Sequence, residues 1–260
     1  QSYRRLNIMV KFMLHGCNGK MGRMITEIVK GEENAVIAAG VDAFTEVPND
    51  YPVFDSVEKC DIDVDVVIDF STAKAVNSLL DYCVEKKLPV VLCTTGLSEE
   101  QLKKVEEASK EIAILKSANM SLGINLLLKL LQSAAKVLAP AGYDMEIVER
   151  HHNQKLDAPS GTALALADSL NDALDQEYHY VYDRSQVRQK REKKEIGISA
   201  VRGGTIVGDH EVIFAGTDEV IEFKHSAYSR SVFAKGAVEA GKYLAGKAAG
   251  MYDMGDVVGL

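Results

Sequence analysis

The chain has 260 residues, of which 47% are hydrophobic and 26% are charged, and its formal net charge is −8. These values exclude a disordered chain, and the negative charge argues against nucleic acid or an anionic membrane as the main partner. The length allows one large domain or two, and the arrangement of expected elements favours two.

The cysteines indicate the compartment. Cys17, Cys60, Cys83 and Cys93 form neither a C-x-x-C pair nor a zinc-ligand pattern, and Cys83 and Cys93 lie in apolar segments. We therefore expect reduced, buried thiols in a cytoplasmic protein without a metal site.

The first residues contain an apolar run that resembles the core of a signal peptide. Because the chain begins with Gln1, we expect residues 1–8 to be an added or upstream extension, with Met9 as the start. Two arginines precede the run, but Lys11 interrupts it and no small-residue cleavage site follows. We therefore expect a strand here, and no stretch is long enough to span a membrane.

Strand and helix patterns alternate through the N-terminal half. Strands are expected at 8–14, 35–41, 65–70, 88–94 and 112–116, and helices around 21–29, around 76–84 and after Ser98. Ser98 and Gln101 have the spacing of a capping box. This alternation predicts an α/β domain with a Rossmann-type, doubly wound parallel sheet.

Glycines follow the first expected strand in the sequence HGCNGKMG. In a dinucleotide site, Gly16 would make the tight turn, Gly19 would let the backbone approach a pyrophosphate, and Gly22 would let the helix pack against the strand. Asp42 ends the next strand, where an acidic side chain can bind an adenosine ribose. The glycines alone are also compatible with an ordinary turn, and the strand, the helix and Asp42 favour the dinucleotide site.

Ligands of doubly wound sheets bind beyond the carboxyl ends of the strands. The expected cofactor-binding residues are therefore Gly16, Cys17, Asn18, Gly19, Lys20, Met21, Gly22, Asp42, Phe70, Ser71, Thr94, Thr95, Gly96, Ala118, Asn119 and Met120. Each segment after the later strands could equally be a plain loop, and only their shared position argues for a cleft.

The alternation stops in the C-terminal half. A helix is expected at 122–138 and another at 163–174, with strands around 145–148 and at 196–201, 211–215 and 220–225. They predict a second, α+β domain with an open mixed sheet and helices on one face. A final helix at about 231–248 is expected to return to the first domain. The expected domains are 1–121 with 230–260 for the dinucleotide, and 122–229 for substrate and oligomerisation.

The charged stretch at 184–195 lies between the helix at 163–174 and the later strands. We expect a solvated loop there, and a binding patch is the alternative.

Residues 144–163 concentrate the reactive side chains. His151 and His152 are adjacent, and Lys155 follows four residues after the first histidine. Histidine is an acid near neutral pH and Lys155 is a fixed cation. These features suit a small carboxylate substrate that gains a proton. Alternatively, the histidine pair is a polar surface feature or a chance metal contact.

A Pro-Ser-Gly-Thr turn opens the helix after these residues. Ser160 can cap that helix, and the backbone amides of its first turn, at Gly161 and Thr162, can bind an anion. The turn therefore adds a site for a substrate carboxylate.

Several segments together resemble the 4-hydroxy-tetrahydrodipicolinate reductases, formerly called dihydrodipicolinate reductases. They are HGCNGKMG, TTG at 94–96, SANMSLGIN at 117–125, EIVERHHNQKLDAPSGTA at 146–163, RGGTIVGDHEVIF and HSAYSRSVFAKGA. The resemblance covers the chain from Met9 and is most specific in HH-x-x-K-x-DAPSGTA. It implies a cytoplasmic homotetramer that reduces 4-hydroxy-tetrahydrodipicolinate with NADH or NADPH in the diaminopimelate route to lysine.

The resemblance also implies roles for individual residues. His151 would be the general acid, Lys155 would be the cation at the reacting ring, and His152 with the Gly161–Thr162 turn would hold the carboxylates. Ser160, which starts that helix, belongs to the same expected substrate site.

The sequence departs from the family pattern at two positions. Cys93 stands where the family often has glycine, and Ala43 follows Asp42 where the family often has a basic residue for the NADP 2′-phosphate. We therefore expect NADH to serve at least as well as NADPH. The competing interpretations are a non-catalytic dinucleotide sensor and a different nicotinamide-dependent reductase of a small carboxylate.

Overall fold

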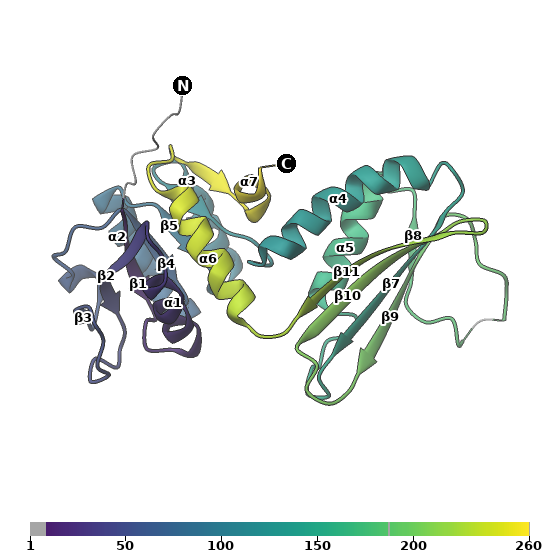
Figure 1. The fold of residues 1–260 in the computed structure, drawn as a ribbon. Helices are drawn as coiled ribbons and strands as arrows, with labels where there is room; N and C mark the ends of the chain where they lie inside the picture. The colour runs from purple at the N-terminus through teal and green to yellow at the C-terminus, as the bar shows by residue number, and fades with distance from the viewer. Residues whose placement is uncertain (1–8, 187, 260) are drawn as a thin grey trace, which may run out of the picture. The chain divides into compact units, whose positions relative to one another are not determined.

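The computed structural model describes residues 9–186 and 188–259, and Figure 1 shows its elements. The expectations for residues 1–8, including the first strand's start at residue 8, lie outside the described residues. The described residues divide into two compact units, 9–121 with Ser231–Gly259, and Leu122–Arg230.

The first unit is built on a seven-stranded sheet in the order β12-β6-β5-β4-β1-β2-β3, and all of its strand pairs are parallel. The strands are β1 (Val10–His15), β2 (Ala35–Val41), β3 (Val53–Phe54), β4 (Val66–Asp69), β5 (Val90–Leu92), β6 (Ala113–Leu115) and β12 (Gly250–Tyr252). Strand order runs outward from β1 in both directions, which creates the crevice where such sheets bind ligands. The predicted doubly wound parallel sheet is confirmed.

Helices cover both faces of this sheet, so its strands are apolar on both sides. The helices are α1 (Lys20–Lys30), α2 (Val76–Lys86), α3 (Glu99–Ser109), α6 (Ser231–Leu244) and α7 (Met254–Val258). Met13 of β1 packs with residues of α2 and α3, whereas Phe12 lies against Gly241 of α6. The predicted capping box at the start of α3 is confirmed, with the Gln101 amide 3.2 Å from Ser98 Oγ.

The second unit has a five-stranded mixed sheet in the order β11-β10-β7-β9-β8. Its strands are β7 (Asp144–His151), β8 (His179–Val181), β9 (Glu195–Arg202), β10 (Gly208–Ala215) and β11 (Val220–Ala227), and its helices are α4 (Leu122–Leu138) and α5 (Gly161–Asp172). β7 runs parallel to β9 and antiparallel to β10. The predicted α+β unit with a mixed sheet is therefore confirmed.

Both helices of the second unit pack on one face of the sheet. Met145 and Ile147 of β7 and Phe214 of β10 form the core with Leu131 of α4 and Leu166 of α5. Because side chains alternate along a strand, the next inward positions of β7 after Ile147 are Glu149 and His151. The buried face thus becomes polar toward the end of β7.

Several short elements were not predicted. They are β3, β8, β12, α7 and two single-turn helices, Val57–Lys59 and Ala73–Ala75. The last long helix ends at Leu244 instead of the expected residue 248, and the chain then adds β12 to the edge of the first sheet.

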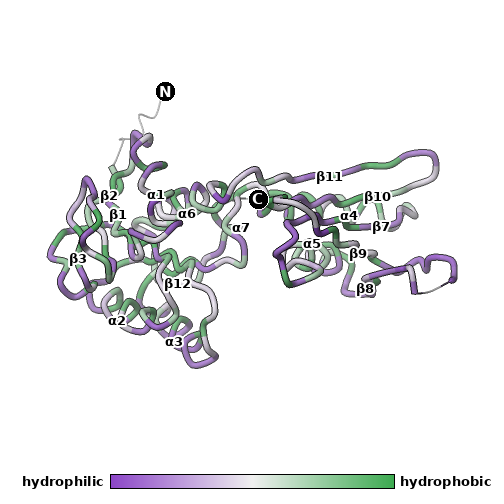
Figure 2. Tube along the Cα trace, turned by 90° about the horizontal axis from the view of Figure 1, so that it is seen from below, coloured by the Kyte–Doolittle hydropathy of each residue, from purple (hydrophilic) through white to green (hydrophobic). Residues whose placement is uncertain are grey.

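The charged stretch before β9 was predicted only in part. Figure 2 shows mostly hydrophilic colouring between β8 and β9. However, Arg191 donates hydrogen bonds to Asp144 and Glu146, and Glu195 is buried within β9. The end of this stretch is therefore anchored to the sheet and is not a freely solvated loop.

Candidate active site

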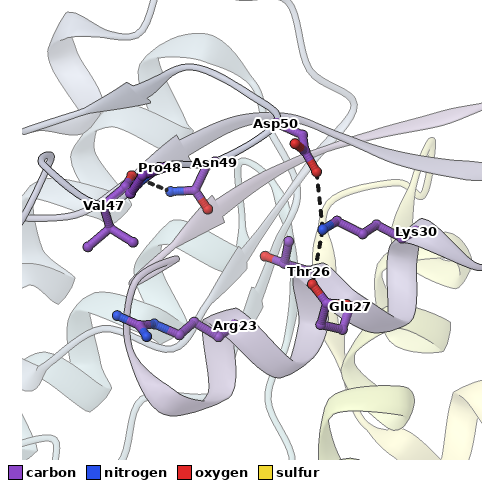
Figure 3. Close-up of a pocket in the computed structure, with 8 residues that line it drawn as sticks. All are labelled: Arg23, Thr26, Glu27, Lys30, Val47, Pro48, Asn49 and Asp50. Carbon is purple, nitrogen blue, oxygen red and sulfur yellow. Dashed lines mark hydrogen bonds and ion pairs between the residues drawn. The ribbon is translucent and has the colours of Figure 1, made fainter.

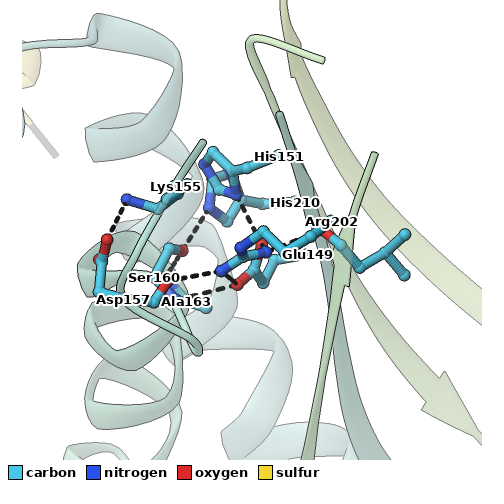
Figure 4. Close-up of polar contacts among 9 residues, drawn as sticks. Glu149, His151, Lys155, Asp157, Ser160, Ala163, Arg202 and His210 are labelled. Carbon is cyan, nitrogen blue, oxygen red and sulfur yellow. Dashed lines mark hydrogen bonds and ion pairs between the residues drawn. The ribbon is translucent and has the colours of Figure 1, made fainter. Parts of the chain in front are cut away.

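A buried carboxylate forms the centre of the polar cluster in the second unit. Glu149 of β7 is fully buried and accepts hydrogen bonds from three sides (Figure 4). Arg202 donates to both of its oxygens, at 2.7 and 2.8 Å, and the Ser160 amide donates at 2.9 Å. An unpaired buried charge would be costly, and these donors compensate it.

The same donors control the protonation of Glu149. Burial alone would raise the pKa of this carboxyl, but hydrogen bonds from Arg202, His151 and the Ser160 amide outweigh it and lower the pKa below its ordinary value. Glu149 is therefore an anion at neutral pH.

His151 lies directly against this anion. Its Nδ1 is 2.6 Å from Glu149 Oε2, and its side chain is 10% exposed. A Cβ added at Gly208 would lie 3.1 Å from His151 Nε2, so the glycine leaves room beside that nitrogen. With Nδ1 held by a carboxylate, Nε2 is the ring nitrogen left to exchange a proton with a ligand.

A second histidine completes the cluster. His210 of β10 lies opposite Glu149 in the sheet, and its ring meets that of His151 edge to face at 5.1 Å. His210 Nε2 is 3.0 Å from Ser160 Oγ, which also accepts a hydrogen bond from the Ala163 amide. Burial, followed by the nearby His151, lowers the pKa of His210 to about 4, so His210 is neutral at physiological pH.

Ser160 caps α5, as predicted, because its side chain accepts from the third amide of the helix. The Ser160 side chain is buried and engaged with His210 and Ala163, whereas Gly161 is exposed and Thr162 is half-buried. The exposed start of α5 therefore presents backbone to a ligand, with Ser160 holding the turn from behind.

Lys155 lies at the same end of α5 (Figure 4). Its ammonium is 2.8 Å from Asp157 Oδ1, and its backbone amide donates to the His152 carbonyl. The hydrogen bond from Lys155, with a smaller contribution from the Gly161 amide, lowers the pKa of Asp157. A carboxylate of the chain thus interacts with the groups that were predicted to hold a substrate carboxylate.

The sequence interpretation did not include Glu149, Arg202 or His210. They come from three strands, and register brings them together: Arg202 lies beside His151, and His210 lies beside Glu149. The sequence indicates Glu149 in one way: it lies at the same alternate positions of the strand as Met145 and Ile147, which face the core.

The glycine turn of the first unit has the geometry that close packing requires. Gly16 has a φ of +81°, and a Cβ there would lie 2.5 Å from the Phe70 carbonyl. A Cβ at Gly22 would lie 2.3 Å from the Gly16 carbonyl. Gly19 caps α1 without a side-chain hydrogen bond, so the first amides of the helix are available to an anion. These features fit the pyrophosphate of a dinucleotide.

Asp42 is close to this turn at the end of β2. Its carboxylate accepts hydrogen bonds from the backbone amides of Asn18, at 2.9 Å, and Phe44, at 3.0 Å. The Asn18 side chain in turn accepts a hydrogen bond from Asn49. Asp42 therefore connects the glycine turn to the loop that follows β2. The Cys17 side chain is fully buried, and burial raises the pKa of its thiol to about 12, so this residue offers its backbone to a ligand.

A second carboxylate, which the sequence interpretation missed, organises the ends of the central strands. Asp69 of β4 is fully buried and accepts a 2.6 Å hydrogen bond from Thr94 and a 3.2 Å hydrogen bond from the Ser71 amide. His15 Nδ1 lies 2.8 Å from Asp69 Oδ1, the oxygen that also accepts from the Ser71 amide. Asp69 thus ties together the ends of β1, β4 and β5, where the cofactor loops were predicted.

The remaining predicted cofactor residues lie at the same edge of the sheet, after their strands. Lys20, Thr95, Gly96 and Ala118 are exposed, Met21 and Asn119 are half-buried, and Met120 is buried. A Cβ added to Gly236 of α6 would overlap the Met120 carbonyl, so the Met120 backbone packs directly against α6. The Met120 side chain is also buried, so this residue belongs to the core.

A cavity of about 440 Å³ lies beside α1 and the loop after β2 (Figure 3). It is lined by Arg23, Thr26, Glu27, Lys30, Val47, Pro48, Asn49 and Asp50. Asn49 joins it to the Asp42 cluster through Asn18. None of the predicted site residues lines this cavity.

Within residues 9–186 and 188–259, no group of three or more histidine, cysteine or acidic side chains could hold a metal ion. In the same part of the chain, no helix combines the length and apolar character needed to cross a membrane.

A dinucleotide-type unit joined to an α+β unit with an oriented histidine is typical of the oxidoreductases that use a nicotinamide nucleotide. Family models for the two parts of dihydrodipicolinate reductase match this chain, the N-terminal model at residues 10–120 and the C-terminal model at residues 123–258. The chain belongs to the dihydrodipicolinate reductase family.

Comparison with individual proteins gives the same family. The chain is 53% identical to the 4-hydroxy-tetrahydrodipicolinate reductase of Caldanaerobacter subterraneus subsp. tengcongensis, over 96% of this chain and 99% of the relative. It is also 53% identical to the enzyme of that name from Clostridium tetani, over 95% and 96% of the two chains. A solved structure of dipicolinate-bound dihydrodipicolinate reductase from Paenisporosarcina sp. TG-14 has a TM-score of 0.79 and 25% identity, covering 95% of this chain and 98% of that chain.

Proposed function

We propose that the protein converts 4-hydroxy-tetrahydrodipicolinate, NADH or NADPH and a proton into tetrahydrodipicolinate, the oxidised nucleotide and water, in the diaminopimelate route to lysine. The observation that carries this proposal is the buried pair of Glu149 and His151 beside Lys155 and the exposed start of α5. An oriented proton donor next to groups that bind carboxylates suits a dicarboxylate substrate that is protonated as it is reduced.

The second unit is proposed to bind the substrate. Lys155 attracts one carboxylate, and the Gly161 and Thr162 amides donate hydrogen bonds to a carboxylate at the positive end of the α5 dipole. Ser160 fixes this turn through its buried hydroxyl, and half-exposed His152 adds a polar contact. The dicarboxylate bound to the Paenisporosarcina relative supports this substrate class.

The bound nicotinamide supplies the hydride, and this chain must supply the proton. His151 is proposed to deliver it from Nε2, since Nδ1 is engaged with Glu149. A positioned general acid contributes about a hundred to ten thousandfold in rate. Lys155 stabilises the negative charge that the ring gains as the hydride arrives. Solvent then returns a proton to His151.

The first unit is proposed to bind the cofactor. The amides of Lys20, Met21 and Gly22 at the start of α1 suit the pyrophosphate, and Asp42 suits the hydroxyls of the adenosine ribose. In NADPH the 2′-phosphate would meet the like charge of Asp42, and Ala43 provides no cation. We therefore propose that NADH serves at least as well as NADPH, although Lys20 of the same turn is a cation within the cofactor site.

We further propose a cytoplasmic homotetramer that assembles through the second unit's sheet. The helices cover one face of that sheet, and the other face carries partly exposed apolar residues, including Val201 at 44% and Val220 at 56%. Light scattering tests this assembly, and a monomer at micromolar concentration would contradict it.

The activity is tested by mixing the protein with NADH and freshly generated 4-hydroxy-tetrahydrodipicolinate and following the loss of nicotinamide absorbance. The proposal predicts rapid oxidation that depends on this substrate. Binding of NADH without oxidation would favour a dinucleotide sensor. Oxidation with a different small carboxylate, and none with this substrate, would favour another reductase of the same class.

A further inference from the structure

The Glu149 carboxylate lies between a fixed cation and the proposed proton donor. Arg202 contacts both carboxylate oxygens, and His151 Nδ1 contacts one of them at 2.6 Å from the other direction. Arg202 also donates to the Asp157 carbonyl at 2.6 Å. One arginine therefore holds both the carboxylate behind His151 and the backbone of the substrate turn.

The hydrogen bonds to Glu149 determine which His151 nitrogen carries a proton. Arg202 and the Ser160 amide are obligatory donors, so Glu149 can only accept, and its third partner must present an N–H. His151 therefore holds its proton at Nδ1 when neutral. Its Nε2 then takes up and releases the proton that is exchanged with the substrate.

We propose that Glu149 is a positioning residue, which fixes the Nδ1–H tautomer and the orientation of His151, and that Arg202 fixes Glu149. This inference rests on the proposed role of His151 as proton donor. Burying an ion pair for stability alone brings little net gain, since a well-packed apolar pair is often as good. Orientation of the His151 ring therefore explains why Glu149 and Arg202 are buried as a charged pair.

The principal test is Glu149→Gln. Glutamine has one acceptor oxygen, so it cannot satisfy Arg202, the Ser160 amide and His151 together. We expect the turnover number to fall by about tenfold or more while the Michaelis constant for substrate changes by less than about threefold. Unchanged turnover would overturn the proposal.

Nitrogen NMR of labelled protein adds a readout that a merely structural role would not change. In the parent, neutral His151 should carry its proton on Nδ1, and in Glu149→Gln the two tautomers should mix. A single Nδ1–H form in both proteins would contradict the positioning role. If Glu149→Gln does not fold, the double variant Glu149→Gln with Arg202→Gln removes the unpaired guanidinium and receives the same measurements.

Glu211→Gln is the matched control. Glu211 and Arg150 form a carboxylate–guanidinium pair at 3.0 Å on the opposite face of the neighbouring strands, and Glu211 is 15% exposed. Its loss should cost stability without changing the turnover number or the His151 tautomer. An equal change of both readouts in this control would show that any broken pair on these strands has the effect, and would remove the assignment to Glu149.

His151→Gln separates this inference from the proposed function. If His151→Gln keeps near-normal turnover, the proton-donor role fails and the Glu149 proposal fails with it. If His151→Gln is inactive while Glu149→Gln keeps the parent's turnover and tautomer, the proton donor stands and only the positioning role is wrong.

Discussion

The hydroxyl oxygen of Ser160 lies 3.0 Å from Nε2 of His210, and both side chains are buried. Because Ser160 Oγ already accepts the Ala163 amide, its proton is free to point at His210. The helix cap and the neutral histidine therefore support each other, and protonation of His210 would disrupt both.

This contact predicts an acid-sensitive fold. The pKa of His210 is about 4 when folded against an ordinary value of 6.5, so the unfolded chain binds more protons between these values. Stability is therefore lost as pH falls from about 6.5 toward about 4. His210→Asn should reduce the difference in unfolding free energy between about pH 7.5 and about pH 5 by about 2 kcal/mol in urea titrations.

His179→Asn is the control for that measurement. His179 lies exposed at the start of β8, so its replacement should leave the parent's pH dependence in place. A parent protein equally stable at both pH values would contradict the account of His210.

Gly22→Ala should impair cofactor binding. Its Cβ would lie 2.3 Å from the Gly16 carbonyl and 2.5 Å from the Cys17 carbonyl, and these backbone atoms can move only by distorting the turn. The dissociation constant for NADH, measured by fluorescence, should rise by about tenfold or more, which is about 1.4 kcal/mol. Gly31→Ala, at the other end of α1, is the control. Its Cβ would have no neighbouring atom nearer than 3.5 Å, so this variant should bind NADH normally. Equal binding by both variants would refute the close-packing argument.

Asp42→Asn should shift cofactor preference toward NADPH. The change removes the like charge that would face the 2′-phosphate, so the ratio of catalytic efficiency with NADPH to that with NADH should rise by about tenfold. Asp50→Asn removes an equal charge from the same loop region, where Asp50 pairs with Lys30, and should leave the ratio unchanged. The account of Asp42 fails if the parent already prefers NADPH by about tenfold.

Asp157→Asn should strengthen dicarboxylate binding. In the free protein, Asp157 pairs with Lys155 at 2.8 Å and must be displaced before a substrate carboxylate can use that cation. Exposed pairs of this kind are worth about 0.2–1 kcal/mol, so the dissociation constant for dipicolinate should fall by up to about fivefold in calorimetry. Asp172→Asn, at the far end of α5, is the charge-matched control. Weaker binding by Asp157→Asn would mean that Asp157 itself holds the ligand.

The sequence was most informative where a pattern was long. The expected bounds of α4, 122–138, and of β2, 35–41, coincide with the structure, because continuous apolar periodicity or a buried apolar run leaves few alternatives. The end of α6 and the three residues of β12 were missed, since short edge elements depend on the neighbouring strand, here β6.

The site was predictable only for residues that are near in sequence. Ser160 could be expected as a cap because capping is local. Glu149 was overlooked because Val148 is also apolar, which obscures the strand parity that places Glu149 inside. Arg202 and His210 reach the site through strand register, and register depends on tertiary pairing that one sequence does not display.

The most direct test of the central claim is single-turnover hydride transfer by His151→Gln at saturating substrate, compared with Lys155→Ala. His151→Gln keeps a polar side chain but removes the proton donor, so the transfer rate should fall by about a hundredfold or more with little change in substrate affinity. Lys155→Ala deletes a charge that acts before and during the reaction, so its rate and affinity should both worsen. Near-normal transfer by His151→Gln with weakened substrate binding would contradict the account, because His151 would then only bind substrate.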